Sequence, residues 1–319
     1  MEQSENMDYA IALVRVQSDI TSLSQLRGFR SCHTGFGKQS GWIAPVGTLI
    51  EERLIPGQDC DRAKEISEFF SSSCVPGAAD SRIHINGSSS GVEKLCQQCI
   101  GGDNNQHVCE LSRAEKYYGE EGAMRCLVEG RGDVAFVNHK TPLRFIDGKS
   151  SAPWAFFLRS SDFRLLCREG DHHSDRESNH RLGQLNDFRH CHLAKLPGRI
   201  VATTSLISND TKFDALKVLV SLSDMFSHKV PMSFRLFGPF RNESNQIFSD
   251  DTFLLKAVPF DSSYKQVFDE QFLKYLEYND IQVCASSAQA HHHYSNNNNL
   301  MVKSLLLLLL CTLLSKFIH

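Results

Sequence analysis

The chain has 319 residues and a formal net charge of −3, from 34 lysines and arginines against 37 aspartates and glutamates. This length suits about two domains with a sizeable core. The nearly balanced charge excludes the basic field that nucleic-acid binding requires, so we expect no nucleic-acid partner.

The cysteines indicate the compartment. Of the eleven cysteines, ten lie in the body of the chain and one, Cys311, in its tail. An even ten favours five disulfides in an oxidising environment. Acceptor triplets for N-glycosylation at Asn86, Asn209 and Asn242 agree with secretion. Residues 1–16 lack the basic start and the long apolar core of a signal peptide, so we expect the chain to be a fragment of a longer product.

The first elements mix strand and helix. Residues 9–16 are largely apolar and predict a buried strand. Residues 42–54 predict a helix despite Gly47, and residues 60–70 carry apolar side chains at helical spacing.

Between the first strand and the first helix, residues 31–42 form a glycine-rich stretch. It holds three glycines, a hydroxyl and one cation, namely Gly35, Gly37, Gly41, Thr34 and Lys38. Backbone N–H groups at the start of a helix favour an anion, and glycine lets the backbone approach it closely. The stretch therefore predicts a small-oxyanion site, although an ordinary turn without a ligand explains the pattern about as well.

Residues 71–109 are rich in loops and hold Cys74, Cys96, Cys99 and Cys109. The pair Cys96 and Cys99 has the spacing of a redox centre or of half a zinc site. A zinc site needs a second close pair, which the sequence does not provide. We therefore favour structural disulfides here.

The remaining elements keep the same alternation. We expect a helix over residues 120–129, a buried strand over 133–138, a helix over 153–159, an extended segment over 163–167, a strand over 199–204 and amphipathic helices over 213–226 and 267–278. Interleaved helices and strands predict an α/β fold. His172, His173, His180 and His190 match no metal motif, and we expect an exposed loop there.

The tail is distinct from the body. Residues 285–299 are small and polar, and six leucines follow at residues 305–310. This apolar run is shorter than the roughly 20 residues of a membrane-spanning helix. Small residues, a polar spacer and an apolar end are typical of a GPI-attachment signal, with Ser286 as the attachment site. A short tail-anchor helix is the alternative.

Several motifs together carry a family resemblance. They are the stretch 31–42, Glu65-Ile-Ser-Glu-Phe-Phe70 with Cys74-Val-Pro76, Tyr117-Tyr-Gly119, residues 122–129, residues 132–139, Pro153-Trp154 and Cys191-His-Leu-Ala194. In this order they resemble the transferrin family, over residues 9 to about 284. With its GPI-like tail, the chain is most similar to the C-terminal lobe of a membrane-anchored, insect-type member. The resemblance implies a lobe of two α/β subdomains with mixed sheets, resembling periplasmic binding proteins, with one subdomain incomplete here.

The resemblance also implies a ligand set. Transferrins hold Fe³⁺ through an aspartate, two tyrosines and a histidine, with carbonate as a second anion, and hard oxygen donors suit this ion. Tyr9 matches the first tyrosine, whereas Glu120 replaces the second and Arg199 replaces the histidine. The aspartate lies upstream in the family and is not in this chain. We therefore expect no tight Fe³⁺ binding, and an ion pair between Glu120 and Arg199 across the cleft instead.

For the anion, the resemblance implies Thr34, Lys38, Ser40 and Gly41. Lys38 replaces an arginine, which turns a planar bidentate donor into a point charge. The implied disulfides are Cys32–Cys126, Cys60–Cys284, Cys74–Cys99, Cys96–Cys109 and Cys167–Cys191. The implied parts are an anion-binding subdomain at residues 1–187, the end of a second subdomain at 188–284, a linker at 285–299 and a hydrophobic tail at 300–319.

Two functions follow as hypotheses. The first is a membrane-anchored extracellular protein of an iron-transport family whose Fe³⁺ site is degenerate. The second is a metal-free module for cell-surface adhesion or junction assembly. We expect no enzyme, because the serine, histidine and aspartate residues follow no catalytic motif. The expected partners are a membrane, through the GPI anchor, and a small anion, while the sequence indicates no particular protein partner.

Overall fold

The computed structural model describes residues 2–3, 7–57, 61–80, 91–169, 182–204, 206–227, 234–238, 247–248, 252–260 and 262–279. By its contacts the chain divides into two units, Met1–Ile281 and Gln282–His319. All described residues lie in the first unit. The predictions for the linker and tail, including Ser286, and for the disulfide Cys60–Cys284 therefore lie outside the described residues.

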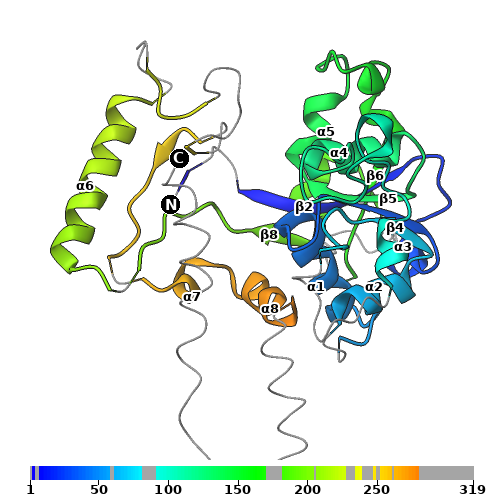
Figure 1. Ribbon diagram of the computed structural model, residues 1–319, viewed down its shortest axis with the longest axis horizontal. Helices are drawn as coiled ribbons and strands as arrows, with labels where there is room; N and C mark the ends of the chain where they lie inside the picture. The colour runs from blue at the N-terminus through cyan, green and yellow to red at the C-terminus, as the bar shows by residue number, and fades with distance from the viewer. Residues whose placement is uncertain are drawn as a thin grey trace, which may run out of the picture. The chain divides into compact units, whose positions relative to one another are not determined.

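A mixed sheet forms the centre of the fold (Figure 1). Its seven strands are β2 (Asp8–Arg15), β3 (Arg30–His33), β4 (Ser72–Cys74), β5 (Val134–Asn138), β6 (Phe163–Leu166), β7 (Leu182–Gly183) and β8 (Ala194–Leu196). The order is β4-β3-β5-β2-β6-β7, and β8 also pairs with β2. β3 runs parallel to β4 and β5, whereas β2 is antiparallel to β5, β6 and β8. The predicted α/β class is confirmed.

β2 is the central strand, and its sequence explains why. Residues 10–14 are each at most 1% exposed. Leu13 lies opposite Ala135 of β5 on one side and Leu165 of β6 on the other. A strand with hydrogen-bonded neighbours at both edges and covered faces requires an unbroken apolar run rather than an alternating one.

Eight helices accompany the strands in the described part of the chain. They are α1 (Ala44–Glu51), α2 (Arg62–Phe69), α3 (Val92–Cys96), α4 (Gly119–Val128), α5 (Lys140–Phe145), α6 (Asn209–Met225), α7 (Tyr264–Val267) and α8 (Glu270–Asn279). Figure 1 shows α4 and α5 on one side of the sheet and α1 and α2 on the other. The predicted helices at residues 42–54, 60–70 and 120–129 correspond to α1, α2 and α4. Asp61 caps the start of α2, and its side chain accepts the Lys64 N–H at 3.0 Å.

Two predicted elements differ from the structure. Residues 199–204 form no strand but an exposed segment, and β8 lies just before them. Only Pro153–Ala155 of the predicted helix at 153–159 is helical, as a 3₁₀ turn. In both cases local apolar spacing was compatible with more than one backbone conformation. The helix predicted at 267–278 is confirmed as α8, which the separate short helix α7 precedes.

The second half of the chain has a smaller core of its own. Leu236, Phe237 and Leu255 are buried there, and α6 packs on them through Leu219, Leu222 and Phe226. β9 (Leu254–Leu255) pairs with β1 (Glu2–Gln3). The prediction that α6 buries an apolar face is only partly correct, because Phe213 is 49% exposed and Ser223 is its one buried residue.

α8 joins the first core although it comes from the far end of the described chain. Phe272 and Tyr275 are 1% and 0% exposed and belong to that core. The Tyr275 hydroxyl donates to Glu51 of α1 at 2.6 Å. Gly47 permits this contact, because a Cβ atom there would lie 2.2 Å from Cγ of Tyr275. No described helix is long and apolar enough to cross a membrane.

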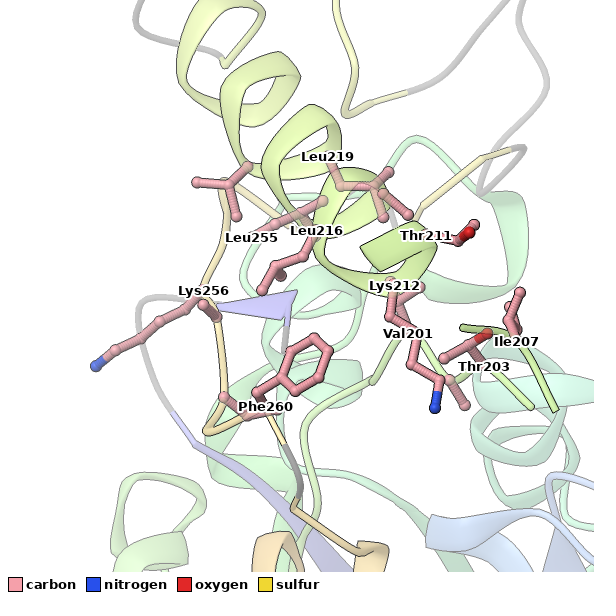
Figure 2. A pocket seen from close by; sticks show the side chains of 15 residues that line it. Val201, Thr203, Ile207, Thr211, Lys212, Leu216, Leu219, Leu255, Lys256 and Phe260 are labelled. Atoms are coloured by element: carbon pink, nitrogen blue, oxygen red, sulfur yellow. The ribbon is translucent and has the colours of Figure 1, made fainter. Parts of the chain in front are cut away.

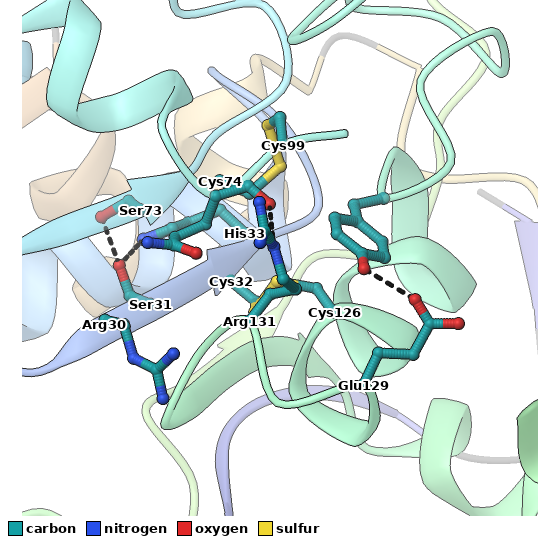
Figure 3. The surroundings of a disulfide bond; sticks show 12 residues. Arg30, Ser31, Cys32, His33, Ser73, Cys74, Cys99, Cys126, Glu129 and Arg131 are labelled. Carbon is teal, nitrogen blue, oxygen red and sulfur yellow. Dashed lines mark hydrogen bonds between the residues drawn. A yellow bond between two sulfur atoms is a disulfide. The ribbon is translucent and has the colours of Figure 1, made fainter. Parts of the chain in front are cut away.

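Four of the implied disulfides are formed in the structure: Cys32–Cys126, Cys74–Cys99, Cys96–Cys109 and Cys167–Cys191. The first ties β3 to α4 across 94 positions of sequence (Figure 3). Cys96 and Cys99 therefore have different partners and do not form a redox pair. Together these bonds fix the loops around the glycine-rich stretch.

Candidate functional site

The glycine-rich stretch opens a helix, as the sequence predicts. β3 ends at His33, and a π-helical turn (Gln39–Ile43) leads into α1. The first N–H groups of this turn have no preceding carbonyl within the helix to accept their hydrogen bonds. Gly41 of this turn packs against the side chain of Thr34, since a Cβ atom on Gly41 would lie 2.1 Å from its Oγ1. Only glycine fits at this position.

Thr34 is 2% exposed, and its Oγ1 atom has no hydrogen-bond partner. A buried hydroxyl without a partner is costly in a folded protein. It lies against the start of a helix, where an anion could accept from both the hydroxyl and the backbone. This orphaned oxygen is the structural feature that fits a small oxyanion.

Lys38 does not complete this cradle. Its side chain is exposed, and its Nζ atom lies 5.3 Å from the centroid of the Tyr118 ring. The charge is therefore held over an aromatic face rather than directed into the turn. Lysine offers a flexible point charge where a guanidinium would offer a planar pair of donors.

Ser40 and Glu120 link the turn to the start of α4. The buried Ser40 hydroxyl donates to Oε1 of Glu120. Oε2 of the same carboxylate accepts the backbone N–H of Asn138 at 2.6 Å and the hydroxyl of Thr141 at 2.9 Å. Loss of hydration raises the pKa of Glu120, and the charge of Asp8 adds to this, while the three hydrogen bonds oppose it.

The predicted ion pair between Glu120 and Arg199 stays a prediction. Both oxygens of Glu120 are occupied by donors from α1's entry turn, β5 and α5, and none of its described contacts is to Arg199. Arg199 lies exposed in the extended segment after β8.

Tyr9 lies at the start of β2 among other rings. Its ring centroid is 4.8 Å from that of His192, 5.4 Å from that of His139 and 5.5 Å from that of Phe188. The Tyr9 N–H donates to Nδ1 of His139 at 3.1 Å. Burial lowers the pKa of His139 to about 4, so this ring is neutral at pH 7. Tyr9, which the resemblance matches to the first tyrosine ligand, is thus packed in an aromatic cluster.

A buried hydrogen-bond network, which the sequence analysis did not predict, holds the backbone of the glycine-rich turn. His33 donates from Nδ1 to the Gly41 carbonyl at 2.7 Å, and its Nε2 accepts from Ser31 at 2.8 Å. Ser31 in turn bonds Ser73 of β4 at 2.6 Å, in the region that Figure 3 shows. Burial lowers the pKa of His33 to about 4 and keeps the ring neutral. The one available signal was the position of His33 directly before Thr34.

Two other features carry no evident chemistry. Cys74, Cys99 and Glu115 are close enough to suggest a metal site among the described residues. The two cysteines are joined in a disulfide, however, and Glu115 accepts four backbone N–H bonds. An apolar cavity of about 210 Å³ lies beside α6, lined by residues such as Val201, Leu216 and Phe260 (Figure 2). Its lining has no pair of groups suited to catalysis.

The predicted modification sites are described in part. Asn209 is the first residue of α6 and is exposed, as glycosylation would require. Asn86 and Asn242 lie outside the described residues, as do His172, His173 and His180.

Comparison with known proteins gives a consistent match. The sequence model of the family described as Transferrin matches residues 1–280. The chain is 38% identical over 253 residues to melanotransferrin from Oryctolagus cuniculus, covering 79% of this chain and 31% of that protein. It is 35% identical over 268 residues to a transferrin from Blaberus discoidalis, covering 82% and 35%. Otolith matrix protein 1 from Oncorhynchus mykiss is 34% identical over 253 residues, covering 78% and 63%. The chain spans about a third of the length of the first two relatives.

Proposed function

Since the chain belongs to the transferrin family, whose members are extracellular, non-enzymatic binding proteins for iron, we propose that it is a membrane-anchored member whose Fe³⁺ site is degenerate. We further propose that it corresponds to the C-terminal lobe of a melanotransferrin-like protein. The GPI-like tail supports the anchoring, and the similarity to melanotransferrin supports the lobe.

The contacts of Glu120 carry this proposal. A carboxylate stands where the resemblance places a tyrosine ligand, and donors of its own domain hold both of its oxygens. To coordinate iron, Glu120 would have to give up these bonds. The residues present therefore do not fit a ferric ion, since Tyr9 is the only retained ligand position and Arg199 would bring a second positive charge.

The anion cradle is better preserved than the metal site. Thr34 keeps a buried hydroxyl without a partner, and Gly41 keeps the space beside it. We propose that Thr34, with the backbone of Ser40 and Gly41, holds a small oxyanion weakly. The negative charge of Glu120 on the other side of Ser40 limits this binding.

Equilibrium dialysis against a ferric chelate in bicarbonate buffer tests the proposal. The chain should retain far less than one ferric ion per molecule, while a serotransferrin dialysed in parallel loads fully. Stoichiometric iron on the chain would overturn the degenerate site. Release from cells by a phospholipase specific for phosphatidylinositol tests the anchor separately.

The adhesion or junction module remains the second candidate. The same contacts of Glu120 favour it, because a lobe without a metal can still act as a rigid scaffold. One relative is named for an otolith matrix, which is a structural setting. If the whole protein binds iron through another lobe, iron transport is favoured over the adhesion or junction function.

A further inference from the structure

The loop between α5 and β6 exposes two neighbouring phenylalanines. Phe156 is 61% and Phe157 85% exposed, and their rings meet edge to face with centroids 4.9 Å apart. A single exposed apolar side chain is ordinary on a protein surface, but two adjacent aromatic rings form a small continuous apolar patch. Neither the anion site nor the core makes use of them.

This loop, residues 147–160, is well ordered by its own hydrogen bonds. The Asp147 N–H donates to the Leu158 carbonyl at 2.8 Å, and the Ser160 N–H donates to the Asp147 carboxylate at 2.9 Å. Behind the phenylalanines, the Trp154 ring packs on Phe145 with centroids 4.9 Å apart. The closed base and the packed tryptophan hold the two rings out from the surface. The exposure of the two rings therefore follows from the hydrogen-bonded structure of this loop.

Positive charge surrounds the two rings. Arg144, Lys149 and Arg159 are all exposed, and none forms an ion pair with another described residue. Because residues 147 and 158 are hydrogen bonded, Lys149 and Arg159 lie near the same base of the loop. The acidic side chains of Asp147 and Asp162 accept backbone N–H bonds. Both carboxylates keep their negative charge, so three basic against two acidic side chains leave residues 144–162 with a net charge of +1.

We propose that the 147–160 loop is a contact for a phospholipid surface. Phe156 and Phe157 insert among the headgroups, and Arg144, Lys149 and Arg159 bind the lipid phosphates. Aromatic side chains with nearby lysine and arginine are typical of interfacial membrane contacts. A convex pair of rings suits a bilayer, which needs no preformed pocket to receive it. The contact is independent of any anchoring through the C-terminal tail.

Trp154 provides a local probe. The chain has two tryptophans, and the other, Trp42, is 2% exposed. Full-length protein is mixed with vesicles of phosphatidylcholine and phosphatidylserine that carry brominated acyl chains. Quenching of Trp154 fluorescence reports contact by this loop rather than by the tail, which has no tryptophan.

The wild type should be quenched, and the W154F variant should not. The double variant F156S/F157S should partition at least about tenfold more weakly, since it removes two apolar side chains from the contact. The variant K149E/R159E should weaken binding, and added salt should do the same. F29S, which alters another partly exposed phenylalanine (38% exposed), serves as the control and should bind normally.

Wild-type protein that is not quenched, or F156S/F157S protein that is quenched like the wild type, overturns the proposal. In the first case, a protein partner would be the remaining occupant for the two rings. Thermal unfolding of each variant, expected to match the wild type because the altered side chains are exposed, excludes loss of folding as the cause.

Discussion

The Ser40 hydroxyl donates a hydrogen bond to Oε1 of Glu120, and this contact joins the glycine-rich turn to the residue that stands where the family resemblance places a tyrosine ligand. Ser40 opens the helix that would receive the anion. Glu120 starts α4 and accepts two further hydrogen bonds from Asn138 and Thr141. Donors from three other segments thus hold both oxygens of this carboxylate. The site is closed by internal hydrogen bonds.

The first prediction concerns Glu120 and pH. Its folded pKa lies above the ordinary value of 4.5. Below pH 4.5 the carboxyl is protonated in both states. As pH rises, the unfolded state ionises first, so the free energy of unfolding falls until the pH passes the folded pKa. We expect E120Q to lack this loss, and its stability relative to wild type should increase from pH 4.5 to 7.

Urea unfolding at a series of pH values measures this difference. E121Q is the matched control, because Glu121 is the exposed neighbour on the same helix. A difference between E120Q and wild type that stays constant with pH would show that burial of Glu120 does not perturb its ionisation.

The second prediction concerns Thr34. Because its buried Oγ1 has no partner, T34V should raise the free energy of unfolding by about 1 kcal/mol without an anion. The same change should weaken bicarbonate binding, measured as the loss of the bicarbonate-induced rise in melting temperature. Higher stability together with weaker binding is expected when the replaced residue serves binding at the expense of stability.

T48V is the control for this experiment. Thr48 is also buried, but its hydroxyl donates to the Leu193 carbonyl at 3.3 Å. The T48V variant should therefore have a lower free energy of unfolding than wild type and bind bicarbonate as the wild type does. If T34V is destabilised like T48V, then an unseen partner satisfies Thr34 and the anion cradle is not open.

Sequence alone predicted the local framework and missed the contacts between distant segments. The run of apolar residues in β2 and the helical spacing of α1, α2 and α4 each determine their element locally. The segment at 199–204 has the same apolar character as β2, but no strand in the described part of the chain pairs with it. Pairing depends on tertiary structure, and composition does not reveal it.

At the candidate site, too, the sequence predicted the local motif and missed the contacts between distant segments. The positions of Thr34, Gly41 and Glu120 followed from the motif. The donors to Glu120 did not, because Asn138 and Thr141 lie 18 and 21 positions away. His33 was missed as a support for similar reasons, since its role depends on a serine of β4 and on the fold of the turn.

The third prediction concerns acid stability. Burial lowers the pKa of His33 from 6.5 to about 4. The neutral ring stabilises the fold above pH 6.5, and this contribution is lost as pH falls towards 4, by about 3 kcal/mol in total. H33N should therefore lose less stability than wild type between pH 7 and pH 4. Parallel curves for H33N and wild type would contradict the burial of a neutral His33.

The fourth prediction concerns the docking of α8. A methyl group on Gly47 would overlap the Tyr275 ring, so G47A should destabilise the protein by about 1–3 kcal/mol despite the better helix propensity of alanine. Hydrogen exchange of α8 should accelerate in the variant. In the double variant G47A/Y275A the alanine at 47 should cost much less than it does alone, because the overlapping ring is gone. Equal costs in both backgrounds would mean that α8 does not rest on α1 through Tyr275.

The most direct measurement is a titration with ferric ion in bicarbonate buffer, followed by visible absorption. Iron bound by a tyrosinate gives a strong charge-transfer band. Because Glu120 is held by Ser40, Asn138 and Thr141 and only Tyr9 remains among the ligand positions, we predict no saturable band from this chain. A serotransferrin in the same buffer should show one. A tyrosinate band that saturates at one ferric ion per chain, and that Y9F abolishes, would contradict the account.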